Sequence, residues 1–305
     1  MKVNVYLSYY NGSAYLDEQV NSLLNQQNVD VHIFIRDDGS NEYESAFLDK
    51  YIDNDRVSVI HGQNVGFGKS FMQLLSEVNE MADFYAFCDQ DDVWLDNKLN
   101  TACDVLKRMS GPAAYCAQPK YVNSKLESLE GFGTITDSIR FGEMGVDESL
   151  GYHLFGLGCT YVWNNELNAI LRNFDLNDFS FAHDNFISVL TPFVGVFYRD
   201  STQPILYRQH EKNVSGNKQK KKSLFTKIQG KLKNFNGQTC FNMRKYIVCN
   251  IKPFVAQDKY ELLKMSVDYR KNLFLKFKLM NFMLCGKVDR KKKIKNVLMI
   301  LGNRY

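Results

Sequence analysis

The sequence lacks the features of several large classes of protein. No stretch reaches about 18 uncharged apolar residues, so a membrane-spanning helix is not expected. Residues 1–10 (MKVNVYLSYY) alternate in polarity and lead into a turn, which does not fit a secretory signal peptide. The seven cysteines are odd in number and contain no Cys-x-x-Cys pair, which speaks against a disulfide framework or a zinc cluster. We therefore expect a cytoplasmic protein with free thiols.

The sequence also has no proline-rich linker and no internal repeat, but its charge is divided unevenly. The 305 residues carry a net charge of +4. Residues 208–305 contain 25 Lys/Arg and five acids, a net charge of +20, whereas residues 1–207 contain 13 bases and 29 acids, a net charge of −16. This asymmetry predicts two domains, 1–216 and 217–305.

The first domain shows strand patterns that alternate with helical patterns. The apolar stretches at 2–9, 31–38, 57–62 and 84–88 are each followed by apolar residues at helical spacing. This alternation predicts an α/β fold with a mostly parallel sheet flanked by helices. Ligands of such sheets bind beyond the carboxyl ends of the strands. Polar residues follow these ends at positions 8–11, 37–38, 64 and 89–92, which predicts a site on one rim.

Asp89-Gln90-Asp91-Asp92 is the strongest local signal. Three carboxylates within four residues repel one another unless a cation or protons compensate. Mg²⁺ is typically held by one or two carboxylates together with substrate phosphates, which makes a metal–diphosphate clamp one interpretation. A solvated acidic turn that caps the next helix is the other, and the tetrapeptide does not separate them.

Two further strand ends have competing interpretations. Asp37-Asp38-Gly39-Ser40 fits a tight turn, although a carboxylate there also suits a base N–H or a ribose hydroxyl. Residues 61–70 (HGQNVGFGKS) approach a phosphate-binding P-loop, but Gln63 occupies the position that needs glycine. A glycine-bearing turn is therefore preferred. A P-loop-type NTPase or kinase that uses Lys69 remains an alternative function.

The later polar pairs are also ambiguous from the sequence. His183-Asp184 opens an apolar helical run, so Asp184 is either a helix cap or a general base. Arg208 and His210 follow another apolar stretch. Together they suit diphosphate oxygens or a metal shell, although a lone histidine is usually structural.

The second domain combines apolar stripes with lysines. Residues 218–235 and 273–284 carry such stripes, and basic residues follow the latter at positions 287, 290–293 and 295. This pattern favours a helix lying on an anionic membrane surface over nucleic-acid binding, for which no module is present. A solvated helical domain packed on the core is the plainer alternative.

The order of these motifs resembles family 2 nucleotide-sugar glycosyltransferases of the GT-A fold. The resemblance spans about residues 3–216 and rests on LSYYNG (7–12), RDDGS (36–40), NVG (64–66), CDQDDVWL (88–95), HD (183–184) and YRQH (207–210). The DQDDVW and YRQH stretches look most like the bacterial rhamnosyltransferase subgroup. That subgroup tolerates His183 where many members carry glutamate.

The resemblance implies an inverting transfer to a saccharide or lipid-linked acceptor in bacterial surface-polysaccharide synthesis. It implies a dTDP- or UDP-sugar donor, Mg²⁺ or Mn²⁺, Asp184 as general base, and peripheral membrane attachment. The implied nucleotide-binding residues are Ser8, Tyr10, Asn11, Asp37, Asp38, Asn64, Lys69, Asp89 and Gln90. The implied metal residues are Asp91, Asp92 and His210, with Arg208 at the diphosphate and Trp94 and His183 on the acceptor side. A homodimer is left open, and a non-catalytic membrane scaffold is a further alternative.

Overall fold

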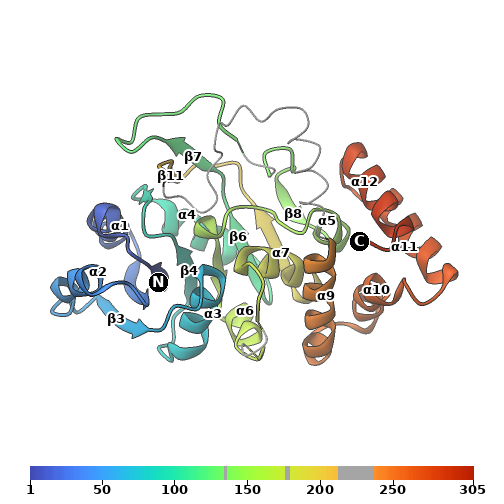
Figure 1. Ribbon diagram of the computed structural model, residues 1–305, viewed down its shortest axis with the longest axis horizontal. Coiled ribbons are helices and arrows are strands. Elements are labelled where there is room, and N and C mark those ends of the chain that lie inside the picture. Colours follow the sequence, from blue (N-terminus) through green and yellow to red (C-terminus); the bar gives the residue numbers. More distant parts are fainter. Residues whose placement is uncertain (134–135, 176–178, 212–236) are drawn as a thin grey trace. The chain divides into compact units, whose positions relative to one another are not determined.

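The computed structural model describes residues 1–133, 136–175, 179–211 and 237–305 (Figure 1). The chain forms two compact units. The first comprises Met1–Met144 and Leu154–Gln209, and the second comprises Gly145–His153 and His210–Tyr305. The expected domain boundary at residue 216 and the amphipathic segment 218–235 lie outside the described residues. No feature of the sequence indicated that Gly145–His153 belongs with the C-terminal helices.

The first unit contains an eight-stranded sheet in the order β3-β2-β1-β4-β9-β6-β10-β8. Its strands are β1 (Lys2–Tyr9), β2 (Asp30–Asp38), β3 (Val57–Gly62), β4 (Phe84–Cys88), β6 (Ala113–Cys116), β8 (Gly142–Met144), β9 (Val162–Asn164) and β10 (Val196–Arg199). Strands β3, β2, β1 and β4 pair in parallel, as do β6 and β10. Strand β9 runs antiparallel to β4 and β6, and β8 runs antiparallel to β10. The expected mostly parallel α/β sheet is confirmed.

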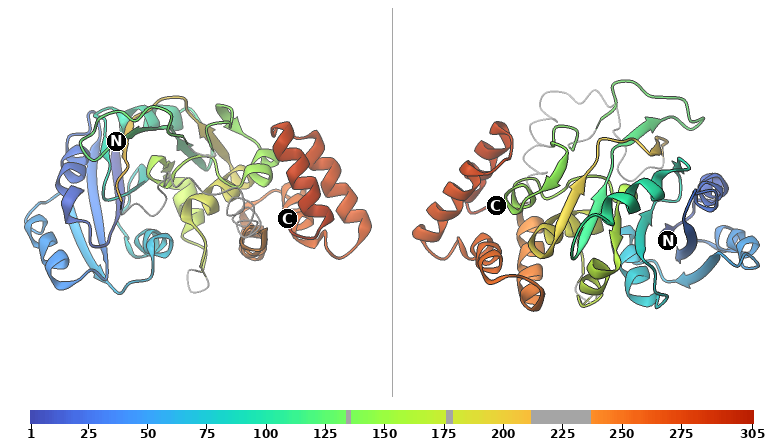
Figure 2. Two further views of the ribbon diagram at one scale, coloured as in Figure 1. Left: turned by 45° about the horizontal axis from the view of Figure 1, so that its top comes forward. Right: turned by 180° about the vertical axis from the view of Figure 1, so that it is seen from behind.

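Helices cover both faces of the sheet, and Figure 2 shows them on either side of β1 and β2. They are α1 (Ser13–Leu24), α2 (Glu42–Ala46), α3 (Phe67–Glu77), α4 (Lys98–Leu106), α6 (Asn165–Leu171) and α7 (His183–Val194), with short 3₁₀ turns η1 (Phe47–Tyr51) and η2 (Gly158–Thr160). Strand β1 is buried on both faces, as a central parallel strand should be. Val3, Val5 and Leu7 belong to the core that includes α1, whereas Tyr6 contacts Phe87 on the other face.

A small three-stranded sheet completes the first unit. It consists of β5 (Val93–Trp94), β11 (Ile205–Arg208) and β7 (Pro119–Val122), with β11 in the middle. Leu206 pairs with Val93, directly after the acidic turn 89–92. The last strand of this unit therefore supports the turn that follows β4.

The second unit is helical, as expected for the C-terminal region. It contains α5 (Val146–Tyr152), α9 (Gly237–Ile251), η3 (Lys252–Phe254), α10 (Gln257–Asp268), α11 (Leu273–Cys285) and α12 (Arg290–Leu301). Buried Tyr305 joins these elements: its hydroxyl donates to the Leu150 carbonyl, and the Arg244 guanidinium lies 4.2 Å from its ring centroid. Arg244 also contacts His153 at 2.8 Å. Among the described residues, no helix is both long and apolar enough to span a membrane.

Candidate active site

The rim expected from the strand ends is present. Strands β1, β2 and β4 are parallel neighbours, and Leu7 pairs with Ile35 on one side and Cys88 on the other. The residues that follow these strands therefore gather at one edge of the sheet. This edge carries the segments 8–11, 37–40 and 89–92.

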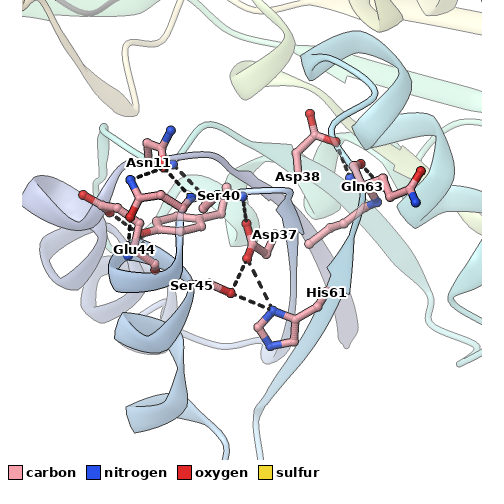
Figure 3. A network of polar contacts seen from close by, with 11 residues as sticks. Asn11, Asp37, Asp38, Ser40, Glu44, Ser45, His61 and Gln63 are labelled. Atoms are coloured by element: carbon pink, nitrogen blue, oxygen red, sulfur yellow. Dashed lines mark hydrogen bonds and ion pairs between the residues drawn. The ribbon is translucent and has the colours of Figure 1, made fainter.

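Asp37 is held in a hydrogen-bond network at the end of β2 (Figure 3). It accepts from the Ser40 backbone N–H at 2.9 Å and from the Ser45 hydroxyl at 2.7 Å, and His61 Nδ1 lies 3.3 Å away. Burial opposes ionisation of Asp37, but the hydrogen bonds from Ser40, Ser45 and His61 lower its pKa below the usual value. Asp37 is thus an ionised anchor that closes the turn into α2.

Asp38 organises the loop that follows β3. Its carboxylate pairs with Arg36 at 2.5 Å and accepts from the backbone N–H groups of Val65 and Gly66, each at 3.0 Å. Gly39, at φ +74°, packs so closely that a Cβ there would lie 2.6 Å from the Asn64 backbone nitrogen. The loop that carries exposed Asn64 is therefore fixed against the end of β2.

The same network reaches β1 and α3. Arg36 donates to Ser70 at 3.2 Å, and the Ser8 hydroxyl bonds to Ser70 at 2.7 Å. Lys69, next to Ser70 in the first turn of α3, has no hydrogen bond or ion pair within the described ranges. Its amine is thus available at the rim.

Side-chain amides connect the three strand ends. Gln90 accepts from the Tyr10 backbone N–H at 2.8 Å and donates to the Tyr10 carbonyl at 3.2 Å. Asn11, in the left-handed region at φ 46°, accepts from the Asn41 backbone N–H at 3.0 Å, and its own N–H donates to Ser40. These contacts leave the Tyr10 side chain 48% exposed on the rim.

The acidic turn and η2 together bring three potential metal ligands close to one another. One ligand atom each from Asp89, Asp92 and Cys159 lies within 4.8 Å of the others. Burial and the charges of Asp91 and Asp89 raise the pKa of Asp92 well above its usual value. Asp92 Oδ1 accepts from the Arg208 backbone N–H at 3.0 Å, whereas its buried Oδ2 has no hydrogen bond among the described residues.

Arg208 is buried and holds the acidic turn in place. Its Nε donates to the Asp91 carbonyl at 2.8 Å, Nη1 donates to the Ser124 carbonyl at 2.6 Å, and Nη2 pairs with Glu18. The guanidinium also lies 4.3 Å from the Tyr15 ring centroid. All three nitrogens are engaged by the protein, which does not favour the diphosphate contact expected of Arg208.

Asp184 occupies the first turn of α7 and faces the acidic turn. Its Oδ1 accepts from the Asn185 backbone N–H at 2.7 Å, and the Gly158 N–H also donates to its carboxylate. Burial outweighs these hydrogen bonds and raises the pKa of Asp184 to about 6. The pKa of Asp89 rises to about 7, because of its burial and then the charges of Asp91 and Asp184. The two carboxylates are therefore close enough to interact.

His183 and Trp94 lie in the core, so neither presents a side chain for the acceptor role expected of it. The His183 ring packs 4.3 Å from Phe71 and 4.7 Å from Phe87, between centroids. Its ring nitrogens have no hydrogen bond in the described part of the chain, and burial lowers its pKa to about 3. Trp94 is buried beneath Lys98, whose Nζ lies 3.3 Å from the indole centroid.

Sequence reasoning missed two residues beneath the acidic turn. Lys98 is fully buried, and burial lowers its pKa to about 7. The sequence signal that could have indicated Lys98 was its position four residues after Trp94, at the start of α4. Cys159 comes from η2, far along the chain, and no sequence feature connected it with Asp92. His210 belongs to the second unit, and its expected metal role stays a prediction.

Known glycosyltransferases are similar to this chain. The family model "Glycosyl transferase family 2" matches residues 5–147. The chain is 28% identical over 218 residues to the dTDP-rhamnosyl transferase RfbG of Shigella flexneri, covering 68% of this chain and 72% of that protein. It is 32% identical over 109 residues to an uncharacterized glycosyltransferase of Nostoc, covering 35% of this chain and 33% of that protein.

Among solved structures, residues 1–349 of S. aureus TarS superpose with a TM-score of 0.57 at 16% identity. The match covers 100% of this chain and 81% of that one. The same TarS segment has also been solved with UDP-GlcNAc and with UDP, with TM-scores of 0.57.

The family match and the similarity to RfbG, on a fold shared with TarS, support an enzyme of the nucleotide-sugar glycosyltransferase class. Residues 5–147 match the glycosyl transferase family 2 model and the chain is similar to a bacterial dTDP-rhamnosyl transferase, as its motifs indicated. The family match includes residues 61–70 and favours the glycosyltransferase over the P-loop NTPase and scaffold alternatives.

Proposed function

We propose that this enzyme transfers a sugar, rhamnose or another hexose, from a dTDP- or UDP-sugar to a hydroxyl of a saccharide or lipid-linked acceptor in surface-polysaccharide synthesis. The similarity to a dTDP-rhamnosyl transferase supports rhamnose as the donor sugar. The likeness to TarS, solved with UDP and UDP-GlcNAc, supports a nucleotide-diphosphate donor more generally. The transfer inverts the configuration of the anomeric carbon.

The closeness of Asp184 to Asp89 is the observation that carries this proposal. Asp184 faces the carboxylates at the end of β4, and its pKa of about 6 leaves it ionised at neutral pH but basic enough to accept a proton. Asp184 takes the proton of the acceptor hydroxyl as the oxygen bonds to the anomeric carbon. The bond from that carbon to the diphosphate oxygen breaks, and its electron pair leaves with the diphosphate.

The nucleotide contacts are assigned to groups that reach the rim. Tyr10, Asn64 and Lys69 are at least partly exposed there, and Ser8 lies beside them. Asp37 and Asp38 hold the segments that carry these groups, through the networks described above. Lys69 offers its ammonium group to the phosphates, and Gln90 and Asn11 fix the backbone around Tyr10.

Among the potential ligands of the acidic turn, the Asp91 carboxylate suits a hard divalent metal best. Mg²⁺ and Mn²⁺ prefer oxygen ligands, whereas the buried side of the turn offers the Cys159 thiol. Asp92 is turned toward that side and is engaged by Arg208. We therefore assign the direct contact to Asp91, with Asp89 beside it. When bound, the metal neutralises the negative charge that grows on the departing diphosphate.

The test compares Asp184→Asn with a matched control, Asp104→Asn, a carboxylate on α4 away from the rim. We expect Asp184→Asn to lose sugar transfer while it still binds the nucleotide-sugar, and Asp104→Asn to keep both. Product formation and binding of dTDP-rhamnose and UDP-sugars by calorimetry provide the two readouts. Turnover retained by Asp184→Asn removes this residue from the base role.

A further inference from the structure

The second unit ends in a helical hairpin whose outer side is apolar. Helices α11 and α12 lie side by side (Figure 2). Their inner residues Leu279, Met283 and Ile300 are buried. Asn296 of α12 donates to the Gly151 carbonyl of α5 at 3.1 Å. The hairpin is therefore fixed on α5 along one side, while other side chains of the same two helices are apolar and exposed.

Leu284 and Ile294 are exposed near the turn of the hairpin, but most of its exposed apolar side chains lie at the opposite end, which we call the apolar end. It consists of Leu273, Phe274, Phe277, Leu298 and Leu301, which are all exposed. The two phenylalanines are 75% and 61% exposed. Lys276 Nζ donates to the Leu301 carbonyl at 3.3 Å, which places the beginning of α11 beside the end of α12. The five exposed apolar side chains therefore lie at the same end of the hairpin.

Helix α11 carries apolar residues on its inner and outer faces alike. A helix that is apolar all round is normally covered on every side, by protein or by lipid. Exposed apolar patches of this kind mark interaction surfaces. With 13 residues, α11 is shorter than the roughly 20 that a spanning helix needs, so lipid would meet it from the side.

The charge of the hairpin identifies the covering surface. Residues 273–301 contain eight Lys/Arg and one acid, a net charge of +7. The single acid, Asp289, is the N-cap of α12, where it accepts from the Lys292 backbone N–H at 3.0 Å and contacts the Tyr152 hydroxyl at 3.3 Å. Arg290, Lys291 and Lys295 are exposed on α12. The hairpin thus carries exposed cations in the first half of α12, and exposed Lys278 on α11 is next to Phe277 of the apolar end.

We propose that the α11–α12 hairpin docks on the surface of an anionic lipid bilayer. The apolar end enters the boundary between headgroups and acyl chains, and the lysines and arginine meet the lipid phosphates. A second copy of the chain suits this surface less well, because a self-complementary contact brings identical cations against one another. The docking itself is argued from the hairpin alone. Its purpose, which is to bring the active site to a lipid-linked acceptor, rests on the proposed function.

The test is flotation of the full chain with phosphatidylcholine vesicles, with and without phosphatidylglycerol. We expect binding to the anionic vesicles that weakens as salt is added. Phe274→Ser/Phe277→Ser should lower the bound fraction about tenfold, and Lys291→Gln/Lys295→Gln should lower both binding and its dependence on salt. Tyr43→Ser is the matched control, because Tyr43 is 76% exposed but lies on α2 of the first unit. Circular dichroism and nucleotide-sugar binding show that each variant is folded.

Two results would overturn the proposal: no binding of the unaltered chain to anionic vesicles, or undiminished binding of the double phenylalanine variant. A dimer in sedimentation velocity that the double variant abolishes, without vesicle binding, assigns the surface to a second copy instead. Transfer to a soluble acceptor is measured separately. Vesicle binding without any transfer contradicts the proposed function but still supports the docking inference.

Discussion

The backbone N–H of Arg208 donates to Asp92 Oδ1 at 3.0 Å, across 116 positions of sequence. The Arg208 side chain also donates to the carbonyl of Asp91. Strand β11 therefore holds the acidic turn at two points, the Asp92 carboxylate and the Asp91 backbone carbonyl. Asp92 is directed into the protein, and the neighbouring Asp91 remains partly exposed. Two adjacent aspartates thus acquire different tasks.

The first prediction separates these tasks. Asp91→Asn should abolish metal-dependent stabilisation by the nucleotide-sugar, whereas Asp92→Asn should retain it, because an amide oxygen still accepts from Arg208. Asp92→Leu leaves that N–H without its partner and should lower the free energy of unfolding by about 1–3 kcal/mol. Thermal shifts with Mn²⁺ or with EDTA, together with urea unfolding, measure both effects. Loss of the metal effect in Asp92→Asn alone would reverse the assignment.

The second prediction concerns the role of Arg208. Arg208→Met removes the buried contacts to Ser124, Glu18 and Asp91 and should lower the free energy of unfolding by about 2–4 kcal/mol. Urea unfolding measures this loss. A stable variant with weakened binding of nucleoside diphosphate would instead support the diphosphate contact expected from the sequence. Lys120→Met, at an exposed position of β7, is the control.

The third prediction is the pH dependence of transfer. Asp184 must be ionised to accept a proton, and burial raises its pKa to about 6. Turnover should therefore fall by about tenfold per pH unit below pH 6 and level off above it. A pH series of initial rates measures the profile, and the binding of the donor serves as control. A rate that stays constant down to pH 4 contradicts a base with this pKa.

The fourth prediction is the acid limb of stability. The pKa of His183 falls from 6.5 to about 3 in the folded protein, so the unfolded chain binds the proton first as the pH decreases. Its contribution to stability is complete above pH 6.5 and is lost progressively between pH 6.5 and 3. One such proton corresponds to about 1.4 kcal/mol per pH unit. His183→Met should flatten the dependence by that amount, as measured by urea unfolding at pH 7, 6 and 5.

An unchanged slope in His183→Met would show that the imidazole is already charged or solvated in the native state. His32 also has a lowered pKa, because of its burial, so the His183→Met variant should retain part of the pH dependence. His32→Gln provides the matched comparison.

Much of the fold was predictable from the apolar patterns. The strand that ends at Asp38 and the one that ends at Cys88 are long, apolar and followed by polar turns, so their ends indicated the rim. Strand β9 was not predictable, because Val162–Asn164 is too short for a periodic signal and its direction depends on β4 and β6.

The directions of individual side chains were less predictable than their positions. His183 and Asp184 are adjacent, yet one packs against Phe71 and the other faces Asp89. Which of them points inward depends on how α7 lies on α3, a tertiary contact that a local motif does not record. The burial of Trp94 likewise depends on a tertiary contact, because Trp94 pairs with Ile205 of β11, more than a hundred residues later.

The position of β11 in the small sheet also constrains the order in which the enzyme can be built during synthesis. It lies between β5 and β7, so neither of these earlier strands has its partner in the small sheet until residues 205–208 leave the ribosome. The acidic turn likewise lacks its hydrogen bonds from Arg208 until these four residues have been made. A nascent chain halted before residue 205 should therefore form the β1–β4 sheet but bind no sugar nucleotide, which makes binding competence a late event in translation.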